Sequence, residues 1–377
     1  MTAREQLISY VKNGGEKFLC SPQIGAGAGF DTKLAGKSWI GDTTLEDTRR
    51  AWEMFDVVPL YNFGLPDLSQ FAPAVRYDSE QRFDPAANRR FSTTTFHTPK
   101  GDLVSTAIED EWKGSCCTKY LITDEEELDI LEYYLDQLLQ EGDFSPISAS
   151  IREMRRVIGE DQALDIQWAM QPYELLCFPN TMDTAVFALT CPEIFRRLMD
   201  KILRLDEKLL PVVAAGGADF VFLGGPGSEM ISPQYYEDFL VPYSQIITQM
   251  AHQNGLLVYT HICSPIEPML SKGYYNQMGI DLFETLSEAP VGNVKSIEDA
   301  FSKLDPAICT RGNIGLDRLL EATPEEIREQ SLHILEMAKK MGRKHILGAS
   351  DYMFYQTPVE NVTAMADAVR EFNAANT

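Results

Sequence analysis

The sequence predicts an α/β fold, a (β/α)₈ barrel of the TIM type, and two regularities of its second half favour this fold. Short apolar segments of strand length recur there, and segments with helical periodicity lie between them. A repeat of about 25 to 40 residues is typical of parallel βα units, whose sheets need covering helices. Because the repeat fills more than half of the chain, a closed barrel is favoured over an open sheet. We expect strands at 165–170, 219–223, 256–260, 281–286, 307–311 and 344–348.

The helical segments between these strands begin with capping signals. Thr323 and Thr357 are each followed by proline and then by glutamate at the third position. This order supplies a capping hydroxyl, a preorganised first helical residue and a reciprocal carboxylate. Ser232 is also followed by proline. After Thr323 the apolar residues keep to one helical face until Gly342, which predicts the end of that helix.

An open, doubly wound sheet is the competing architecture. Such folds place a G-x-G-x-x-G phosphate-binding turn between a strand and a helix. The run Gly25-Ala26-Gly27-Ala28-Gly29 has a similar composition, but no helical segment is apparent after it. We therefore interpret this run as a loop, and the barrel remains the predicted fold.

The first half of the chain is less regular. Residues 90–112 contain two strand-like stretches about a Pro-Lys-Gly-Asp turn, which predicts a β-hairpin inserted beside the barrel. A helix is expected from Thr123, as its cap, to about Gln140. We expect the whole of residues 1–377 to form one barrel domain with an N-terminal extension and this insertion.

Composition limits the classes of partner. The 377 residues carry a formal net charge of −23, which would repel nucleic acid and anionic membranes. No apolar run is long enough for a transmembrane helix, and the N-terminus lacks the pattern of a secretory signal. Seven scattered cysteines, an odd number without a C-x-x-C spacing, are typical of reduced thiols. We expect a cytoplasmic protein, and a homodimer is the default assembly for a soluble enzyme.

The residues just beyond the predicted strands are candidates for chemistry, because the carboxyl ends of all barrel strands face one mouth. Polar side chains follow nearly every strand. In chain order they are Gln171, Tyr173, Glu174, Ser228, Glu229, His261, Cys263, Glu284, Arg311, Asn313, Ser350 and Asp351.

His261 and Cys263 form the most informative pair, since alternate positions leaving a strand can point the same way. Imidazole and thiolate are preferred ligands of Zn²⁺, and Glu284, one strand later, can add a carboxylate. Three protein ligands leave a position open, at which zinc can bind a substrate thiol and lower its pKa.

Each of these interpretations has a structural alternative. His261 can be a hydrogen-bonded histidine beside a core cysteine, because free cysteine often behaves as a small hydrophobe. Glu284 can be a salt-bridged carboxylate. Arg311 can pair with a structural acid, or it can bind a small anionic substrate through its planar fork of donors.

Residues 165–375 resemble the uroporphyrinogen decarboxylase superfamily. The phrases that carry the resemblance are Met230 to Tyr236, Val241 to Tyr243, Gly255 leading to His261-Ile262-Cys263, Arg311 to Ile314, and Thr357 to Val362. The resemblance implies a (β/α)₈ barrel. Its His-x-Cys element is similar to the cobalamin-dependent methyltransferase branch, in which zinc held by histidine and cysteine activates a thiol that accepts a methyl group from a corrinoid protein.

The chain departs from both branches of this superfamily at one position each. Decarboxylases carry an arginine-bearing phrase of the type F-M-R-Q-A-G-R near the N-terminus, where this chain reads Ser21 to Gly27. Methyltransferases of the coenzyme M type carry a third zinc cysteine six residues before the last Thr-Pro, where this chain has Asp351. The distance from His261 to Glu284 matches the spacing of a zinc glutamate in the related cobalamin-independent methionine synthase.

The leading hypothesis from the sequence is a zinc-dependent methyltransferase of a corrinoid methyl-transfer or demethylation system. His261, Cys263 and Glu284 would hold the zinc and Asp351 would add a fourth ligand. Arg311 and Asn313 would position an anionic substrate, Ser350 would also act at the site, and a partner protein would carry the corrinoid. Two alternatives stay open: a metal-free carboxy-lyase related to uroporphyrinogen decarboxylase, and a non-catalytic barrel that binds a corrinoid or tetrapyrrole.

Overall fold

A computed structural model gives the fold, and it describes residues 1–25, 27–65, 68–167 and 181–376. Eight parallel strands form a curled sheet in the order β1-β12-β11-β10-β9-β8-β7-β2. The first and last of these strands are joined where the Val58 amide donates to the Cys20 carbonyl at 2.9 Å, just before β2 begins. The predicted barrel is confirmed, and its strands are β1 (Leu19–Cys20), β2 (Leu60–Gly64), β7 (Ala163–Gln167), β8 (Phe220–Phe222), β9 (Leu257–His261), β10 (Leu282–Glu284), β11 (Cys309–Ile314) and β12 (His345–Ala349).

The six predicted strands correspond to β7 to β12, with ends that shift by one to three residues, and residues 168–170 of the first predicted strand lie outside the described residues. Strands β1 and β2 were not predicted. They lie in the irregular first half, and β1 has only two residues, too few to show a period.

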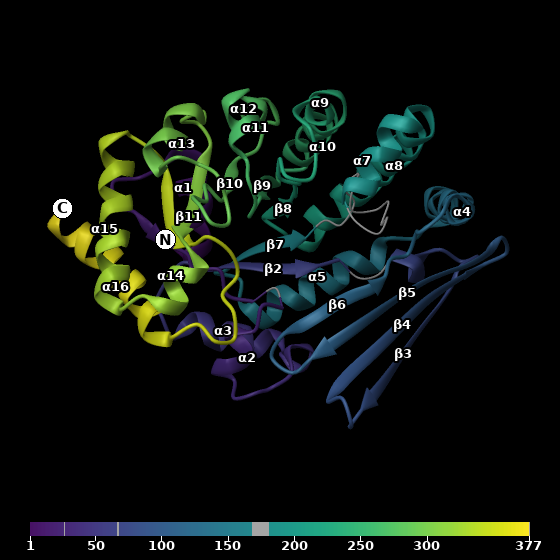
Figure 1. The fold of residues 1–377 in the computed structure, drawn as a ribbon, viewed down its shortest axis with the longest axis horizontal. Helices are drawn as coiled ribbons and strands as arrows, with labels where there is room; N and C mark the ends of the chain where they lie inside the picture. Colours follow the sequence, from purple (N-terminus) through teal and green to yellow (C-terminus); the bar gives the residue numbers. More distant parts are fainter. Residues whose placement is uncertain (26, 66–67, 168–180, 377) are drawn as a thin grey trace.

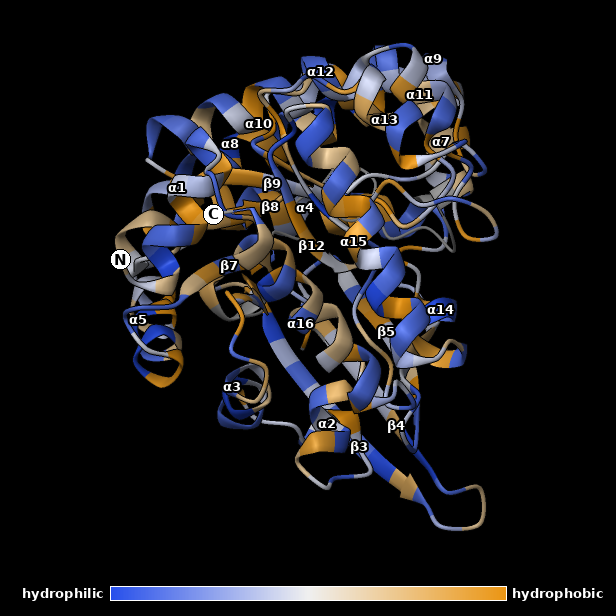
Figure 2. Ribbon diagram, turned by 90° about the vertical axis from the view of Figure 1, so that its left-hand side faces the viewer, coloured by the Kyte–Doolittle hydropathy of each residue, from blue (hydrophilic) through white to orange (hydrophobic). Residues whose placement is uncertain are grey.

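Helices cover the outside of the barrel (Figure 1). Their apolar faces pack on strands that are hydrophobic on both sides, as in β8 and β9 (Figure 2). The helices are α1 (Ala3–Asn13), α2 (Phe30–Leu34), α3 (Leu45–Glu53), α4 (Glu125–Glu141), α5 (Ser145–Ile158), α7 (Thr181–Thr190), α8 (Pro192–Gly216), α9 (Pro233–Tyr235), α10 (Val241–Gln253), α11 (Glu267–Ser271), α12 (Tyr274–Gln277), α13 (Ile297–Lys303), α14 (Leu316–Glu321), α15 (Pro324–Lys340) and α16 (Val359–Ala375), with 3₁₀ turns at Ile40–Asp42 and Leu68–Phe71 and a π-helical turn at Tyr236–Leu240.

The helix ends correct several details of the sequence analysis. Thr323 caps α15 with the full reciprocal bonding that was predicted. Thr357 does not cap α16, because the chain enters that helix through Pro358 and Thr357 is buried. Asp124, rather than Thr123, caps α4. The glycine run does precede a helix, but that helix, α2, has only five residues.

The predicted hairpin is the centre of a larger antiparallel sheet. Strands β4 (Arg89–Thr98) and β5 (Gly101–Asp110) form the hairpin, and β3 (Arg76–Asp84) and β6 (Gly114–Lys119) extend it on either side. Strand β3 alternates poorly and is exposed along almost its whole length, so its sequence gave no period-two signal.

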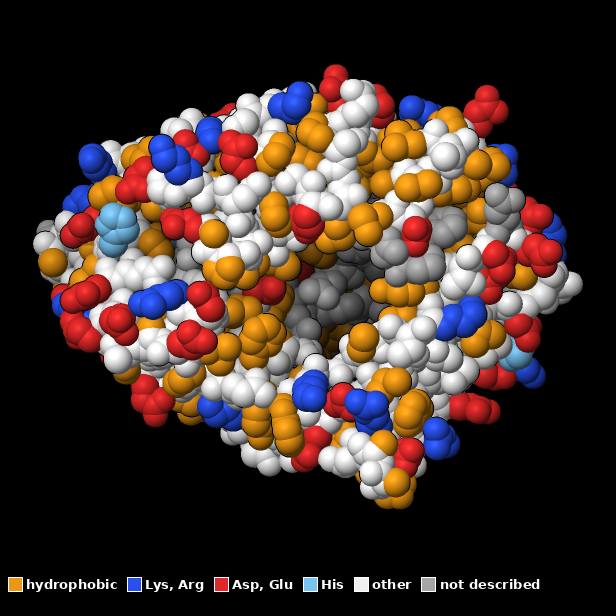
Figure 3. All heavy atoms as spheres, viewed as in Figure 1, with side chains coloured by type: hydrophobic (Ala, Val, Ile, Leu, Met, Phe, Trp, Pro, Cys, Tyr) orange, Lys and Arg blue, Asp and Glu red, His pale blue; other side chains and the backbone are white. Residues whose placement is uncertain are grey.

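This four-stranded sheet leaves the barrel from the carboxyl end of β2 and therefore stands beside the mouth (Figure 1). One end is fixed by the ion pair of Arg90 with Asp42, at 2.9 Å. The other end packs on α4, where the rings of Phe96 and Tyr134 lie 5.8 Å apart. The face of the molecule seen in Figure 3 is hollowed near its centre.

Within the described residues, no helix combines the length and the apolar character needed to span a membrane.

Candidate metal centre at the barrel mouth

Two neighbouring strands bring the first two candidate residues together. His261 is the last residue of β9, and the parallel register places it opposite Glu284, the last residue of β10. Paired positions of adjacent strands point to the same side of a sheet. Both side chains accordingly turn into the barrel, and His261 Nδ1 lies 3.2 Å from Glu284 Oε2.

A third strand and the loop after β9 complete a group of possible ligands. Asp351 lies two residues beyond β12, and Cys263 lies two residues beyond β9. One ligand atom each from His261, Cys263 and Asp351 lies within 4.8 Å of the others. All three residues are partly buried, so the group is sheltered without being closed off from the mouth.

The distance between two members of this group is compatible with a shared metal ion. His261 Nε2 and Asp351 Oδ1 are 3.4 Å apart, and Nε2 is buried with no hydrogen-bond partner among the described residues. Two ligands on one zinc, each with a bond of about 2.0–2.3 Å, lie roughly 3.3–3.8 Å apart. Imidazole, thiolate and carboxylate are also donors that zinc accepts. The chemistry of the three side chains therefore suits zinc.

Glu284 lies beside this group and is bonded to two other residues. Its carboxylate is completely buried, with Oε2 at His261 Nδ1 and Oε1 in an ion pair with Arg311 Nε. It is absent from the group of atoms that lie within ligand distance of one another. Burial alone would raise the pKa of Glu284, but Arg311 and His261 outweigh burial and hold that pKa below its ordinary value.

Arg311 is correspondingly turned inward. It is 1% exposed, and its Nη1 donates to Ser21 Oγ at 3.2 Å in addition to the ion pair with Glu284. Of the two roles left open by the sequence, pairing with a buried acid is the one that the contacts favour. A direct grip on an anionic substrate would require Arg311 to leave Glu284.

The acidic surroundings also determine the protonation of His261. Burial alone would lower the pKa of its imidazole, but the nearby Asp351, Cys263 and Glu284 side chains favour the protonated ring and raise the pKa well above its ordinary value. Metal binding requires the neutral ring, so a metal that enters here must displace a proton.

Asn313 and Ser350 lie to one side of the ligand group. The Asn313 amide oxygen accepts from Thr285 Oγ1 at 2.8 Å and from the Leu286 amide at 3.0 Å, which ties β11 to the loop after β10. Ser350 donates its own amide to the Ile314 carbonyl. Both residues line a cavity of about 440 Å³ that extends between the loop after β10 and α15.

Two further candidate residues, Ser228 and Glu229, lie in the loop after β8. The loop after β8 lies against the loop that carries Cys263, and the Ser228 amide donates to the Pro265 carbonyl at 2.7 Å. Glu229 is exposed in that loop. The remaining candidates Gln171, Tyr173 and Glu174 lie outside the described residues.

The structure adds a buried polar group that sequence analysis missed. Asn62 of β2 donates to Asp165 Oδ2 of β7 at 2.8 Å and bonds the hydroxyl of Tyr259 at 2.7 Å. Burial raises the pKa of Asp165 well above its ordinary value. The Tyr352 ring lies 6.4 Å from that of His261. A polar residue inside an otherwise apolar strand was the available signal.

Comparison with known proteins gives two kinds of relationship. The family model described as Uroporphyrinogen decarboxylase (URO-D) matches residues 111–372. The uroporphyrinogen decarboxylase of Coxiella burnetii (strain Dugway 5J108-111) is 26% identical over 226 residues, which are 56% of this chain and 58% of that protein. That of Prochlorococcus marinus (strain NATL2A) is 24% identical over 250 residues, 63% of this chain and 67% of that protein. The match thus spans less than two thirds of the length of the Coxiella burnetii protein and about two thirds of the Prochlorococcus marinus protein.

A solved structure extends the likeness in fold to the whole chain. A methyltransferase from Methanosarcina mazei matches with a TM-score of 0.69 over 99% of both chains, at 16% sequence identity. At this identity the match shows a common fold, including the region before residue 111 that the family model does not cover.

Proposed function

The chain belongs to the uroporphyrinogen decarboxylase family, and we propose that within this family it is a zinc-dependent methyltransferase of a corrinoid methyl-transfer or demethylation system. The observation that carries the proposal is the convergence of His261, Cys263 and Asp351 from β9 and β12 at the mouth. A decarboxylase that works without metal has no need of an imidazole, a thiol and a carboxylate at ligand distance from one another.

His261, Cys263 and Asp351 would hold the zinc. Bound there, zinc would act as a Lewis acid that lowers the pKa of a substrate thiol or hydroxyl at its open position. The protein would contribute a fixed set of donors, a partly buried position that limits access of water, and the negative charge of two ligands.

For Arg311 and Asn313 we propose roles other than binding an anionic substrate; for Arg311 this is the pairing with an acid that the sequence analysis left open. We assign Arg311 to the support of Glu284, and Asn313 to the junction between β11 and the loop after β10, because their side chains are already bonded there. Ser350 borders the cavity of about 440 Å³, which would accept the part of a small substrate that lies away from the metal. The corrinoid would be carried by a partner protein that approaches the hollowed face of Figure 3.

Metal analysis of the purified protein tests this function. We expect one zinc per chain in the wild type and loss of zinc in both His261→Ala and Cys263→Ala. Stoichiometric zinc in both variants would exclude this centre. Methyl transfer is then measured with a methylated corrinoid as donor and a thiol as acceptor.

Carboxy-lyase activity is the second candidate, and the observation in its favour is that the curated relatives reported above are decarboxylases. Its test is release of carbon dioxide from uroporphyrinogen by the protein after treatment with a chelator. Activity that survives chelation and the Cys263→Ala substitution would select the lyase over the methyltransferase.

A further inference from the structure

We propose that Arg311 and Glu284 are positioning residues that hold His261 with Nδ1 protonated and Nε2 directed at the metal. The inference rests on the proposed zinc centre and adds an account of how that centre is built. Three contacts in series carry it: Arg311 to Glu284, Glu284 to His261 Nδ1, and His261 Nε2 to the ligand group.

Glu284 has no free oxygen with which to bind metal. One oxygen faces the imidazole and the other faces the guanidinium of Arg311. A carboxylate that accepts Nδ1–H fixes the tautomer of the ring and leaves the lone pair of Nε2 available. Glu284 would therefore act through His261, although its spacing in the sequence suggested a direct ligand.

Arg311 determines where Glu284 can lie. It comes from β11, the strand that follows β10 in the sheet, and is anchored at its far side by Ser21 from the end of β1. The Tyr259 ring of β9 lies 5.9 Å from its guanidinium carbon. Arg311, held by Ser21 and Tyr259, thus fixes one oxygen of the Glu284 carboxylate, and the imidazole of His261 faces the other oxygen.

The burial of this pair also suggests a purpose beyond stability. Arg311 and Glu284 are 1% and 0% exposed, and buried ion pairs of this kind often add little net stability compared with apolar residues of the same size. Orientation of a metal ligand is a contribution that two apolar residues at these positions could not make.

The test uses Co²⁺ as a spectroscopic probe of the site in the full-length protein. Glu284→Gln keeps the size of the side chain and removes its charge. We expect one Co²⁺ per chain with the thiolate-to-metal absorption band of Cys263 retained, and an affinity, measured against a chelator, that is about 10- to 100-fold lower. Arg311→Met combined with Glu284→Gln removes both charges, so its folding does not depend on an unpaired buried ion.

Asp219→Asn is the matched control. Asp219 and Arg155 form another buried ion pair, at 2.8 Å with both side chains 4% exposed, at the amino end of β8 and far from the mouth. This variant should unfold at a lower temperature and bind Co²⁺ with wild-type affinity. The double variant should regain thermal stability relative to Glu284→Gln alone and keep the reduced affinity.

The outcomes separate this inference from the zinc centre itself. Wild-type affinity in Glu284→Gln would overturn the positioning role. A changed coordination spectrum in that variant would also overturn it, because Glu284 would then be a ligand. If the wild type binds no Co²⁺, or if Cys263→Ser keeps the thiolate band, the proposed function fails instead.

Discussion

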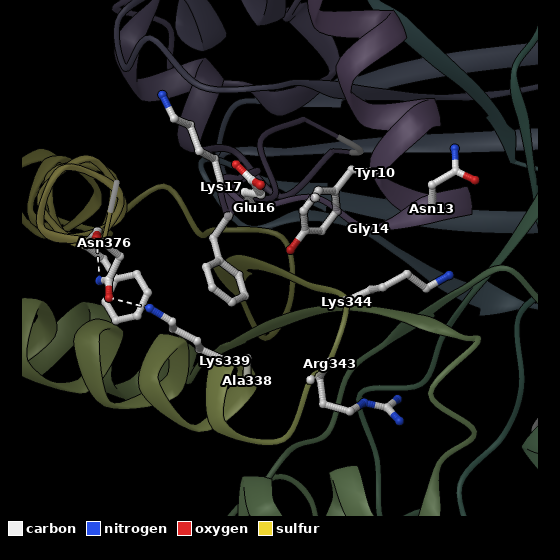
Figure 4. Close-up of a pocket in the computed structure, with 14 residues that line it drawn as sticks. Tyr10, Asn13, Gly14, Glu16, Lys17, Ala338, Lys339, Arg343, Lys344 and Asn376 are labelled. Carbon is white, nitrogen blue, oxygen red and sulfur yellow. Dashed lines mark hydrogen bonds between the residues drawn. The ribbon is translucent and has the colours of Figure 1, made fainter.

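The mouth and the base of the barrel both gather charged residues, and the two ends use them differently. At the mouth, charged side chains face one another, as His261 faces Glu284 and Asp351. At the base, a cavity of about 660 Å³ lies between the ends of α1, α15 and α16 (Figure 4). There Lys344 donates to the Val11 carbonyl at 2.7 Å, and Arg343 donates to the Leu304 carbonyl at 2.8 Å.

The difference shows why cavity size is a poor guide to chemistry in this molecule. The cations at the base donate hydrogen bonds to backbone carbonyls that helix and strand ends leave unpaired. These cations therefore stabilise the fold. The side chains at the mouth are bonded to each other in a way that leaves His261 Nε2 without a hydrogen-bond partner among the described residues. The mouth is therefore better suited than the base to bind a metal ion, because one nitrogen atom of its titratable side chains is not engaged in a hydrogen bond within the described part of the chain.

Removing a ligand at the mouth should have the largest effect. In Asp351→Ala we expect the affinity for zinc to fall by at least about 100-fold, beyond the range of changes in supporting residues. Competition with a chelator measures the affinity. Asp317→Ala, which removes an exposed carboxylate beside the neighbouring cavity, is the control and should bind as the wild type does. Equal affinities in the two variants would remove Asp351 from the site.

A buried histidine at the base should make stability depend on pH. Burial, together with the charge of Arg343, lowers the pKa of His345 to about 3. Below pH ~6.5, His345 binds a proton in the unfolded chain but not in the folded chain. The free energy of unfolding therefore falls by about 1.4 kcal/mol for each unit by which the pH is lowered. His345→Asn should show a shallower fall between pH 6.5 and 4.5 in urea unfolding, whatever its stability at neutral pH. Parallel curves for the two proteins would contradict the assignment.

The contact between Gly227, in the loop after β8, and Ser264, the residue after Cys263, offers a test with a smaller expected effect. A methyl group on Gly227 would lie 2.4 Å from Ser264 Cβ, so Gly227→Ala must displace the loop that carries the cysteine. Overpacking of this kind costs about 1–3 kcal/mol, and we expect a several-fold loss of metal affinity with it. Gly64→Ala is the control, because its added methyl group meets no atom of the described residues within 4 Å. Unchanged affinity in Gly227→Ala would show that the loop adjusts freely.

The smallest effect is expected for a cation at the base. Lys344→Met removes a donor to the Val11 and Lys12 carbonyls at the end of α1. We expect the free energy of unfolding to fall by about 0.5–1 kcal/mol, as for other cations at helix ends, and metal affinity to stay the same. Chemical unfolding together with the chelator assay measures both quantities. A loss of metal affinity in this variant would mean that the two ends are coupled.

Much of the fold could be predicted, because strands β7 to β12 and the helices between them show local periodicity. Strand β2 escaped prediction although it supplies Asn62 to the barrel interior, since its five residues lie within an irregular stretch. The site was predicted as a list of strand ends. The sequence analysis also expected His261, Cys263, Glu284 and Asp351 to meet. It could not predict that Glu284 would face Arg311 while the other three form the group, because contacts between strands depend on register and side-chain direction.

The sequence by itself determined the βα repeat, the mouth at the carboxyl ends of the strands, and the presence there of His261 and Cys263. Only the tertiary structure decided that Asp351 comes to within ligand distance, while Glu284 turns to His261 Nδ1 and Arg311. The physical reason is that local periodicity depends on neighbours along the chain, whereas the partner of a buried charge is set by which strands lie next to each other when the barrel closes.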